Sequence, residues 1–384
     1  MPDKGLFQSF FMGGFECSTH RRRIDRKRLD MIAATAHDRF VVEDYERLRA
    51  FGMTVARDGI RWHLIEKTPY NYDFSSVLPM IRAARELGIQ VIWDLCHYGF
   101  PDDLSIFEPE FVRRYVRLAR AFTELHRNET DSILFVAPIN EISFFSWASG
   151  EVGYFYPFAR RRGNELKTQL VRAAIEGIEA IWSVDPQARI VQIDPLINVV
   201  GRSARNQTAA ENYRLSQYQA WDMLAGRLQP ELGGAAKYLD IIGVNYYRDN
   251  QWFHPGGKKI ARGQPLYRPF RNLLRELYER YRRPVFIAET GIEFDARIDW
   301  LRYIGREVRA AMRSGVPIEG ICWYAIINCP GWDNERHCYN GLWDYANEAG
   351  EREIYVPLAR ELRRQMRLFG QIQTTQGKFR NGFI

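Results

Sequence analysis

The chain has 384 residues, of which 46% are hydrophobic and 26% are charged. These proportions are typical of a folded globular protein, and they exclude a fibrous or intrinsically disordered chain. Lys and Arg outnumber Asp and Glu by 54 to 47, a modest excess that does not by itself indicate a nucleic-acid partner.

Short runs rich in Val, Ile and Phe alternate along the chain with longer stretches of helical period. The predicted strands are Phe10–Phe15, Met53–Arg57, Gln90–Leu95, Ser132–Ile139, Arg189–Asp194, Leu239–Asn245, Val285–Glu289 and Gly320–Tyr324. The predicted helices are Glu43–Phe51, Ser75–Leu87, Pro109–His126, Glu165–Val184, Glu211–Leu228, Arg271–Tyr281, Arg297–Arg313 and Ile354–Leu368. Strict alternation of this kind predicts an α/β protein, a single (β/α)8 TIM barrel.

The barrel is predicted to span residues 1–370, because no stretch rich in Pro, Gly or Ser divides the chain. Gly52 and Gly88 each follow a predicted helix, where glycine can adopt the left-handed conformation that ends it. Residues 371–384 are polar and lack periodicity, so we expect a C-terminal tail there.

The carboxyl ends of the strands carry the chemistry in barrels of this kind. Two carboxylic acids, Glu141 and Glu289, follow the apolar runs of the fourth and seventh predicted strands. A buried carboxylate is costly unless polar partners surround it. The other strand ends offer such supporting side chains: Arg57, His97, Tyr98, Asn140, Asn245 and Tyr247.

Hydrolysis of a glycosidic bond needs one protonated carboxyl group, which releases the leaving oxygen, and one ionised group, which attacks the anomeric carbon. Glu289 is predicted to be the ionised nucleophile because Arg57 and Tyr247 are within its reach. Glu141, beside Asn140, is predicted to be the acid that later serves as the base.

Strand alternation places Asn245 and Tyr247 on one face and Tyr246 on the other. Trp323, at the end of the last predicted strand, has two interpretations. Burial in the core is the commonest fate of a tryptophan. The more specific interpretation is that its indole forms the floor of a sugar pocket, because a sugar ring has an apolar face that stacks on indole.

Six motifs, in order along most of the chain, resemble those of family 1 glycoside hydrolases, the β-glucosidase and β-galactosidase group. They are Glu43-Asp44 followed by Arg57-Asp-Gly-Ile-Arg-Trp62, Cys96-His-Tyr-Gly-Phe-Pro101, Asn140-Glu141, Gly243-Val-Asn-Tyr-Tyr247, Ile287-Ala-Glu-Thr-Gly291, and Trp323 with Trp332. The resemblance implies retention of configuration on β-linked sugars, no metal and no cofactor. It also implies Glu141 as acid/base and Glu289 as nucleophile.

The chain departs from that family's pattern at several positions. The family's Gln-Ile-Glu-Gly after the first strand is replaced by Glu16 to Arg21. Gly331 stands where the family has Glu before the second Trp, and Asp333 follows Trp332 as a candidate replacement. Ile142 replaces the Pro after the acid/base Glu. These changes fall on groups that contact sugar hydroxyls, so the resemblance does not extend to the identity of the sugar.

The sequence therefore predicts a retaining β-glycosidase that acts through a covalent glycosyl-enzyme intermediate on a carbohydrate substrate. Two alternatives remain open: a transglycosylase on the same scaffold, and a carbohydrate-binding barrel without turnover. A metal-dependent hydrolase is disfavoured, because of seven histidines only His97 clearly sits at a strand end.

The cationic run from His20 to Arg28 lacks a nucleic-acid-binding motif, and we expect it to be a solvated loop. A further hypothesis is that Arg21 to Arg23 favour an acidic or phosphorylated sugar. The five cysteines show neither disulfide nor zinc spacing, and neither a signal peptide nor an apolar membrane span is visible. We expect a cytoplasmic protein with neither a nucleic-acid nor a membrane partner; the sequence does not indicate its oligomeric state.

Overall fold

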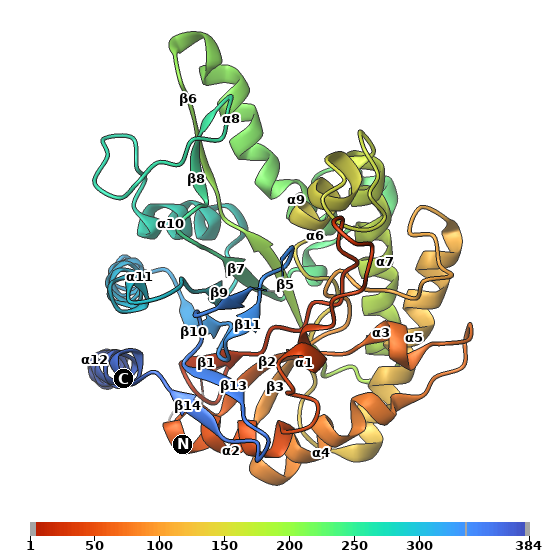
Figure 1. Ribbon diagram of the computed structural model, residues 1–384. Coiled ribbons are helices and arrows are strands. Elements are labelled where there is room, and N and C mark those ends of the chain that lie inside the picture. The colour runs from red at the N-terminus through yellow and green to blue at the C-terminus, as the bar shows by residue number, and fades with distance from the viewer. Residues whose placement is uncertain (1–4, 335, 381–384) are drawn as a thin grey trace.

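The computed structural model describes residues 5–334 and 336–380, with the backbone alone described for 372–380. Eight parallel strands form a closed barrel in the order β1-β10-β9-β7-β5-β4-β3-β2. Their bounds are β1 (Phe11–Gly14), β2 (Val55–Gly59), β3 (Gln90–Asp94), β4 (Phe135–Ala137), β5 (Arg189–Pro195), β7 (Ile241–Asn245), β9 (Val285–Thr290) and β10 (Ile318–Tyr324). The prediction of a single (β/α)8 barrel is confirmed (Figure 1).

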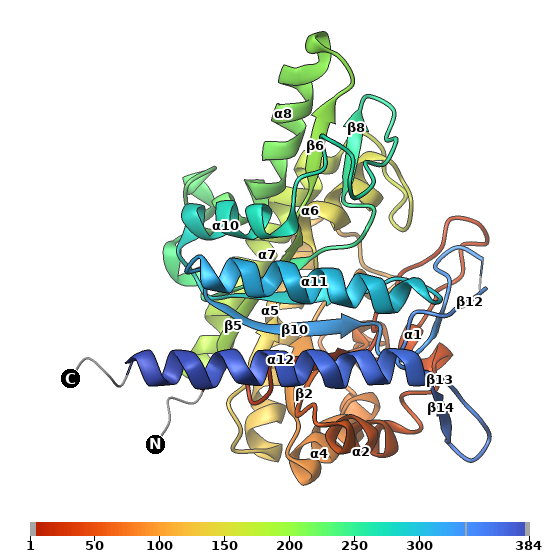
Figure 2. The ribbon, with the colours of Figure 1, turned by 90° about the vertical axis from the view of Figure 1, so that its left-hand side faces the viewer.

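Helices surround the barrel, and Figure 2 shows α11 and α12 side by side on its outer face. The longer helices are α2 (Val41–Phe51), α4 (Leu78–Leu87), α5 (Pro109–Glu129), α7 (Gly163–Val184), α10 (Phe270–Tyr281), α11 (Ala296–Arg313) and α12 (Val356–Arg380). The shorter ones are α1 (Met31–Ala34), α3 (Trp62–Ile65), α6 (Ile142–Phe145), α8 (Gln207–Leu215) and α9 (Gln219–Leu224). As expected, α2 and α4 end at Gly52 and Gly88, whose φ angles are 95° and 65°.

Two segments differ from the sequence prediction. The helix predicted over Glu211–Leu228 is interrupted, because a 3-10 turn at Ser216–Tyr218 separates α8 from α9. The last helix, α12, continues to Arg380 through residues predicted to form a tail. The final part of that predicted tail, 381–384, lies outside the described residues, and the domain boundary at 370 stays a prediction.

Within the described ranges, six further strands lie outside the barrel. The parallel pair β6 (Asn198–Gly201) and β8 (Gln251–His254) projects with α8 from one side of the ring of helices (Figure 1). After β10 come two short antiparallel pairs, β11 (Cys329–Pro330) with β12 (His337–Cys338) and β13 (Trp343–Ala346) with β14 (Arg352–Ile354). Because each is only two to four residues long, none produces a readable alternation in the sequence.

The apolar core has two main layers. Outward-facing side chains of the strands pack against the helices in the larger layer. Inward-facing side chains fill the barrel, and they include Val55, Ile92 and Phe286. At the amino ends of the strands the ring of Phe7 lies 5.1 Å from that of Phe286. The carboxyl ends are occupied instead by polar side chains.

The pairing of β9 with its neighbours is irregular near the carboxyl end of the strand. On β7, Val244 pairs with Ile287 and the next residue, Asn245, pairs with Glu289, so Ala288 is an extra residue on β9. Such a bulge redirects side chains and is common beside active sites. Here Ala288 packs inside the barrel, and the bulge allows its neighbour Glu289 to face inward as well.

In the described part of the chain, no helix combines the length and the apolar character that crossing a membrane requires.

Candidate active site

Arg57, from β2, is the centre of a polar network at the carboxyl ends of the strands. Its guanidinium is fully buried. Nη1 donates to Oε1 of Glu289 at 2.7 Å, and Nη2 donates to Oδ2 of Asp94 at 2.6 Å and to Oδ1 of Asn140 at 2.8 Å. One cation therefore fixes three side chains from three different strand ends, and it compensates the charge of two carboxylates.

Glu289 accepts a second hydrogen bond on its other oxygen, from the hydroxyl of Tyr247 at 2.9 Å. Both oxygens of its carboxyl group are thus held by donors, one of them positively charged. Donors of this kind favour the ionised form of a carboxyl group.

Glu141 has a different environment, because no Arg or Lys side chain in the described part of the chain pairs with it. Tyr98 donates to Oε2, and Nδ2 of Asn245 donates to Oε1 at 2.8 Å. Burial, and then the charge of Glu289, raise the pKa of Glu141 to about 8. Its φ angle is 48°, a left-handed conformation that is costly for a residue with a side chain.

His97 links the two halves of the network. Because Oδ1 of Asn140 accepts from Arg57, Nδ2 of Asn140 must be the donor to Nε2 of His97 at 3.0 Å. Nδ1 of His97 then carries the proton and donates to Oδ2 of Asp94 at 3.0 Å. His97 is thereby assigned as a neutral imidazole of one defined tautomer.

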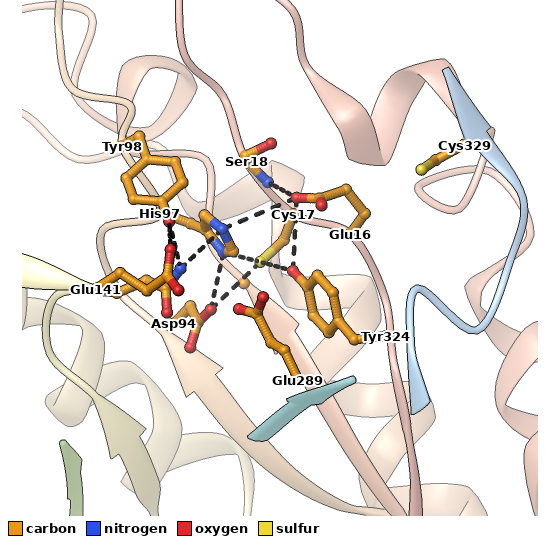
Figure 3. A network of polar contacts seen from close by, with 12 residues as sticks. Glu16, Cys17, Ser18, Asp94, His97, Tyr98, Glu141, Glu289, Tyr324 and Cys329 are labelled. Atoms are coloured by element: carbon orange, nitrogen blue, oxygen red, sulfur yellow. Dashed lines mark hydrogen bonds and ion pairs between the residues drawn. The ribbon is translucent and has the colours of Figure 1, made fainter. Parts of the chain in front are cut away.

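The same amide of Asn140 also donates to the hydroxyl of Tyr98 at 3.0 Å. A continuous path of hydrogen bonds therefore runs from Glu289 through Arg57, Asn140 and Tyr98 to Glu141. Figure 3 shows Glu141 and Glu289 on the two sides of His97 and Asp94. The structure thus brings together the two carboxylic acids and all six of the supporting residues predicted at the ends of strands two, three, four and six.

A cavity of about 240 Å³ opens beside Glu289, at the carboxyl ends of β1, β7, β9 and β10. It is lined by Glu16, residues 247–249, residues 291–293, Tyr324, Ala325 and Asn340. Tyr247 belongs both to this wall and to the hydrogen bonds of Glu289. A small ligand in the cavity would therefore contact Tyr247, the residue that joins this wall to the carboxyl group of Glu289; Glu289 and Glu141 are not themselves in the wall.

Trp323 does not form the floor of this site, and the more specific of its two predicted roles is wrong. The residue is buried between β10 and the helices, and its indole Nε1 donates to the backbone oxygen of Asn340. Strand alternation turns its neighbour Tyr324 inward, with the Arg57 guanidinium 5.0 Å from the centre of its ring. Gly14 makes room for that ring, since a Cβ there would lie 2.1 Å from it.

The two residues predicted from the loop after β10 have separate locations. Trp332 is half-buried, and its ring centroid lies 5.6 Å from that of Tyr98 and 4.5 Å from that of His20. Asp333 is exposed and accepts a hydrogen bond from Tyr154 at 2.6 Å. It does not line the cavity, so the predicted compensation for Gly331 is not found there.

Three residues of the site were not selected from the sequence: Glu16, Asp94 and Tyr324. Asp94 had a readable signal, because it is a carboxylic acid at the end of the apolar run Gln-Val-Ile-Trp. Glu16 and Tyr324 required knowledge of which way each strand faces.

The arginines after β1 lie apart from the cavity. Arg21 and Arg28 both pair with Asp102, and Arg22 pairs with Asp25. None of them lines the cavity, so its wall gives no support to the hypothesis of an acidic sugar.

Cys17, Asp94 and His97 bring a sulfur, an oxygen and a nitrogen within reach of one cation. Sγ of Cys17 lies 3.2 Å from Nδ1 of His97 and 3.6 Å from Oδ2 of Asp94. Asp94 is already paired with Arg57, whose charge would repel a metal ion at this point. Burial, followed by the charge of Asp94, raises the pKa of the Cys17 thiol well above its usual range, which suits a protonated donor. The residues do not fit a metal centre.

Comparisons of sequence find no matching family model and no matching curated protein. Solved structures are similar in fold. A hyperthermophilic β-glucosidase mutant superposes with a TM-score of 0.73 at 17% identity, over 94% of this chain and 99% of the other. A family 1 β-glucosidase from Thermotoga maritima gives 0.73 at 15% identity, over 93% and 97%. The same organism's β-glucosidase in complex with castanospermine gives 0.74 at 16%, over 93% and 97%. These likenesses establish that the chain has the same fold as those proteins.

Proposed function

We propose that the protein is a retaining β-glycosidase, with Glu289 as the nucleophile and Glu141 as the acid/base. The observation that carries the proposal is a pair of buried carboxylic acids at one end of the barrel with opposite environments. Glu289 is paired with a cation, whereas Glu141 lacks one and has a raised pKa. Glycoside hydrolysis with retention requires this division of protonation states.

In the first step the carboxylate of Glu289 attacks the anomeric carbon and forms an ester with the sugar. The bond to the leaving oxygen breaks, and Glu141 transfers its proton to that oxygen. In the second step Glu141, now ionised, takes a proton from water while the water oxygen attacks the anomeric carbon. The ester bond breaks, and its electron pair returns to Glu289 as the carboxylate.

Arg57 and Tyr247 hold Glu289 in position through both steps, because each binds one oxygen of the carboxyl group. Tyr98 and Asn245 do the same for Glu141. Solved structures of the same fold add support, since they are β-glucosidases and one of them is in complex with castanospermine.

The decisive experiment traps the intermediate. An aryl 2-deoxy-2-fluoro-β-glycoside with a good leaving group slows the second step more than the first, so a glycosyl ester accumulates. We expect one label per chain, on the peptide that contains Glu289, by mass spectrometry. A label on another residue, or turnover of aryl β-glycosides with inversion at the anomeric carbon, would contradict the proposal.

A further inference from the structure

Glu16 is a third carboxylic acid at the site, and it lies two residues beyond the end of β1. Its side chain is 9% exposed, and the residue forms part of the cavity wall. Figure 3 shows its carboxyl group beside Ser18 and the hydroxyl of Tyr324. The mechanism proposed above gives this carboxyl group no role.

Only one oxygen of Glu16 is held by the protein. Oε1 accepts from the backbone N–H of Ser18 at 3.0 Å and from the hydroxyl of Tyr324 at 3.5 Å. Oε2 makes no hydrogen bond with any residue between 5 and 334 or between 336 and 380. A mostly buried carboxylate with a free oxygen on a cavity wall is available to a ligand.

Among the residues that the structure describes, no cation pairs with Glu16. The nearest basic group is Nε2 of His97, 3.9 Å from Oε1, and that nitrogen is an unprotonated acceptor in the tautomer assigned above. Every other carboxylate beside the cavity has a cation: Glu289 pairs with Arg57, Asp249 with Arg248, and Glu293 with Arg336.

We propose that Glu16 selects a sugar carrying a protonated amino group, so that the preferred substrate is a cationic β-glycoside. The inference rests on the proposed function, because it takes the cavity beside Glu289 as the sugar site. An ammonium group placed at Oε2 supplies the positive charge that the protein does not. The resulting charge-assisted hydrogen bond is about twice as strong as one between neutral groups.

A neutral hydroxyl group could donate to the same oxygen but would leave the carboxylate charge uncompensated in a mostly buried position. An anionic sugar would be repelled by the same charge. The electrostatics of the wall therefore rank the ligands as cationic, neutral and anionic, in order of decreasing affinity.

Binding should be measured separately from turnover. Methyl 1-thio-β-glycosides, which resist cleavage, would be titrated into the wild-type protein by calorimetry at about pH 6, where an ordinary amine is protonated. The probes are the glucoside and its 2-, 3-, 4- and 6-amino-deoxy forms. We expect one amino form to bind roughly 10- to 100-fold more tightly than the glucoside.

Three variants locate the source of that preference. Glu16→Gln keeps the shape of the side chain and removes its charge. It should therefore bring the affinities for the preferred amino form and for the glucoside within about twofold of each other. Glu16→Asp keeps the charge on a shorter side chain and should retain a preference. Glu293→Gln is the matched control, because it removes a charge from the same wall where Arg336 already compensates it. It should retain most of the preference.

Equal binding of all probes by the wild type would overturn the inference. So would an equal loss of both affinities in Glu16→Gln, which would indicate a hydroxyl site, or an equal effect of Glu16→Gln and Glu293→Gln. The binding measurement itself does not require turnover, so it can fail or succeed separately from the proposed chemistry. A preference without turnover would contradict the glycosidase proposal alone, whereas turnover without a preference would contradict the role of Glu16 alone.

Discussion

The two ends of the barrel differ both in chemistry and in the size of their cavities. The larger cavity, about 1080 Å³, lies at the amino ends of the strands, where Phe7, Gln90, Phe135 and Arg189 are in its wall. The cavity beside Glu289 has less than a quarter of that volume. Yet the smaller one is the cavity that borders the buried network of Arg57 and its carboxylate partners, through Tyr247. In this molecule the arrangement of charges marks the candidate site, and cavity volume does not.

The same strands build both ends. On β2 the inward-facing Val55 is followed two residues later by Arg57, and on β3 Ile92 is followed by Asp94. On each of these strands, one inward-facing residue packs in the apolar core and the next inward-facing residue belongs to the ion network. Stability and chemistry can therefore be disrupted separately, by substitutions a few ångströms apart.

The largest expected effect is at the carboxyl end. Glu289→Gln removes the nucleophile and should lower kcat for an aryl β-glycoside on the order of 10^4-fold, while the protein remains folded. Steady-state kinetics and a thermal melt measure the two properties. Glu165→Gln, on the exposed face of α7, is the control and should leave both unchanged. Comparable activity in the two variants would exclude Glu289 as the nucleophile.

At the amino end we expect a substitution to lower stability and leave kcat unchanged. Phe7→Ala removes a ring packed against Phe135 and Phe286, and should lower the free energy of unfolding by about 3–5 kcal/mol. The kcat of the folded protein should not change, because no side chain of the Arg57 network contacts Phe7. Denaturant unfolding and kinetics below the transition test this separation. A large loss of kcat without a loss of stability would show that the two ends are coupled.

The pH dependence should follow Glu141. Catalysis needs its protonated form, so activity should fall as the pH rises through about 8. The hydrogen bond from Tyr98 favours the ionised form and lowers this pKa. Tyr98→Phe should therefore move the alkaline limb of the kcat/KM profile upward by about one pH unit.

Tyr115→Phe is the matched control for that shift. Its hydroxyl is also buried, but it bonds to the backbone oxygen of Pro138 and does not contact Glu141. The alkaline limb should stay where it is in the wild type. A limb that moves downward in Tyr98→Phe, or equally in both variants, would contradict the assignment of Glu141 as the acid.

The smallest effects should distinguish two neighbours on β10. Tyr324→Phe removes a hydroxyl from the cavity wall and should raise KM roughly 2- to 10-fold. Trp323 lies on the outer side of the strand, so Trp323→Phe should leave KM unchanged. It should lower the free energy of unfolding by about 1–3 kcal/mol. A raised KM in Trp323→Phe, together with an unchanged KM in Tyr324→Phe, would instead indicate that the indole of Trp323 contacts the sugar.

Periodicity and strand-end chemistry were sufficient to predict the eight barrel strands, the location of both carboxylic acids at strand ends, and the contact of Arg57 with Glu289. They were insufficient where the facing direction of a side chain depends on pairing rather than on local sequence. Trp323 and Tyr324 are both aromatic, and only the register of β10 with β1 and β9 decides which one faces inward. Glu16 was missed for a related reason: it follows a short strand in a loop whose path no pattern predicts.

The extra residue in β9 limits how this protein can vary in length. Inserting one further residue before Glu289 would shift the alternation of β9 and turn that carboxyl group toward the helices, where Arg57 could not contact it. Substitutions in the loops can alter the substrate and leave the nucleophile in position. We therefore expect insertions to be tolerated after the strand ends but not within Val285–Thr290.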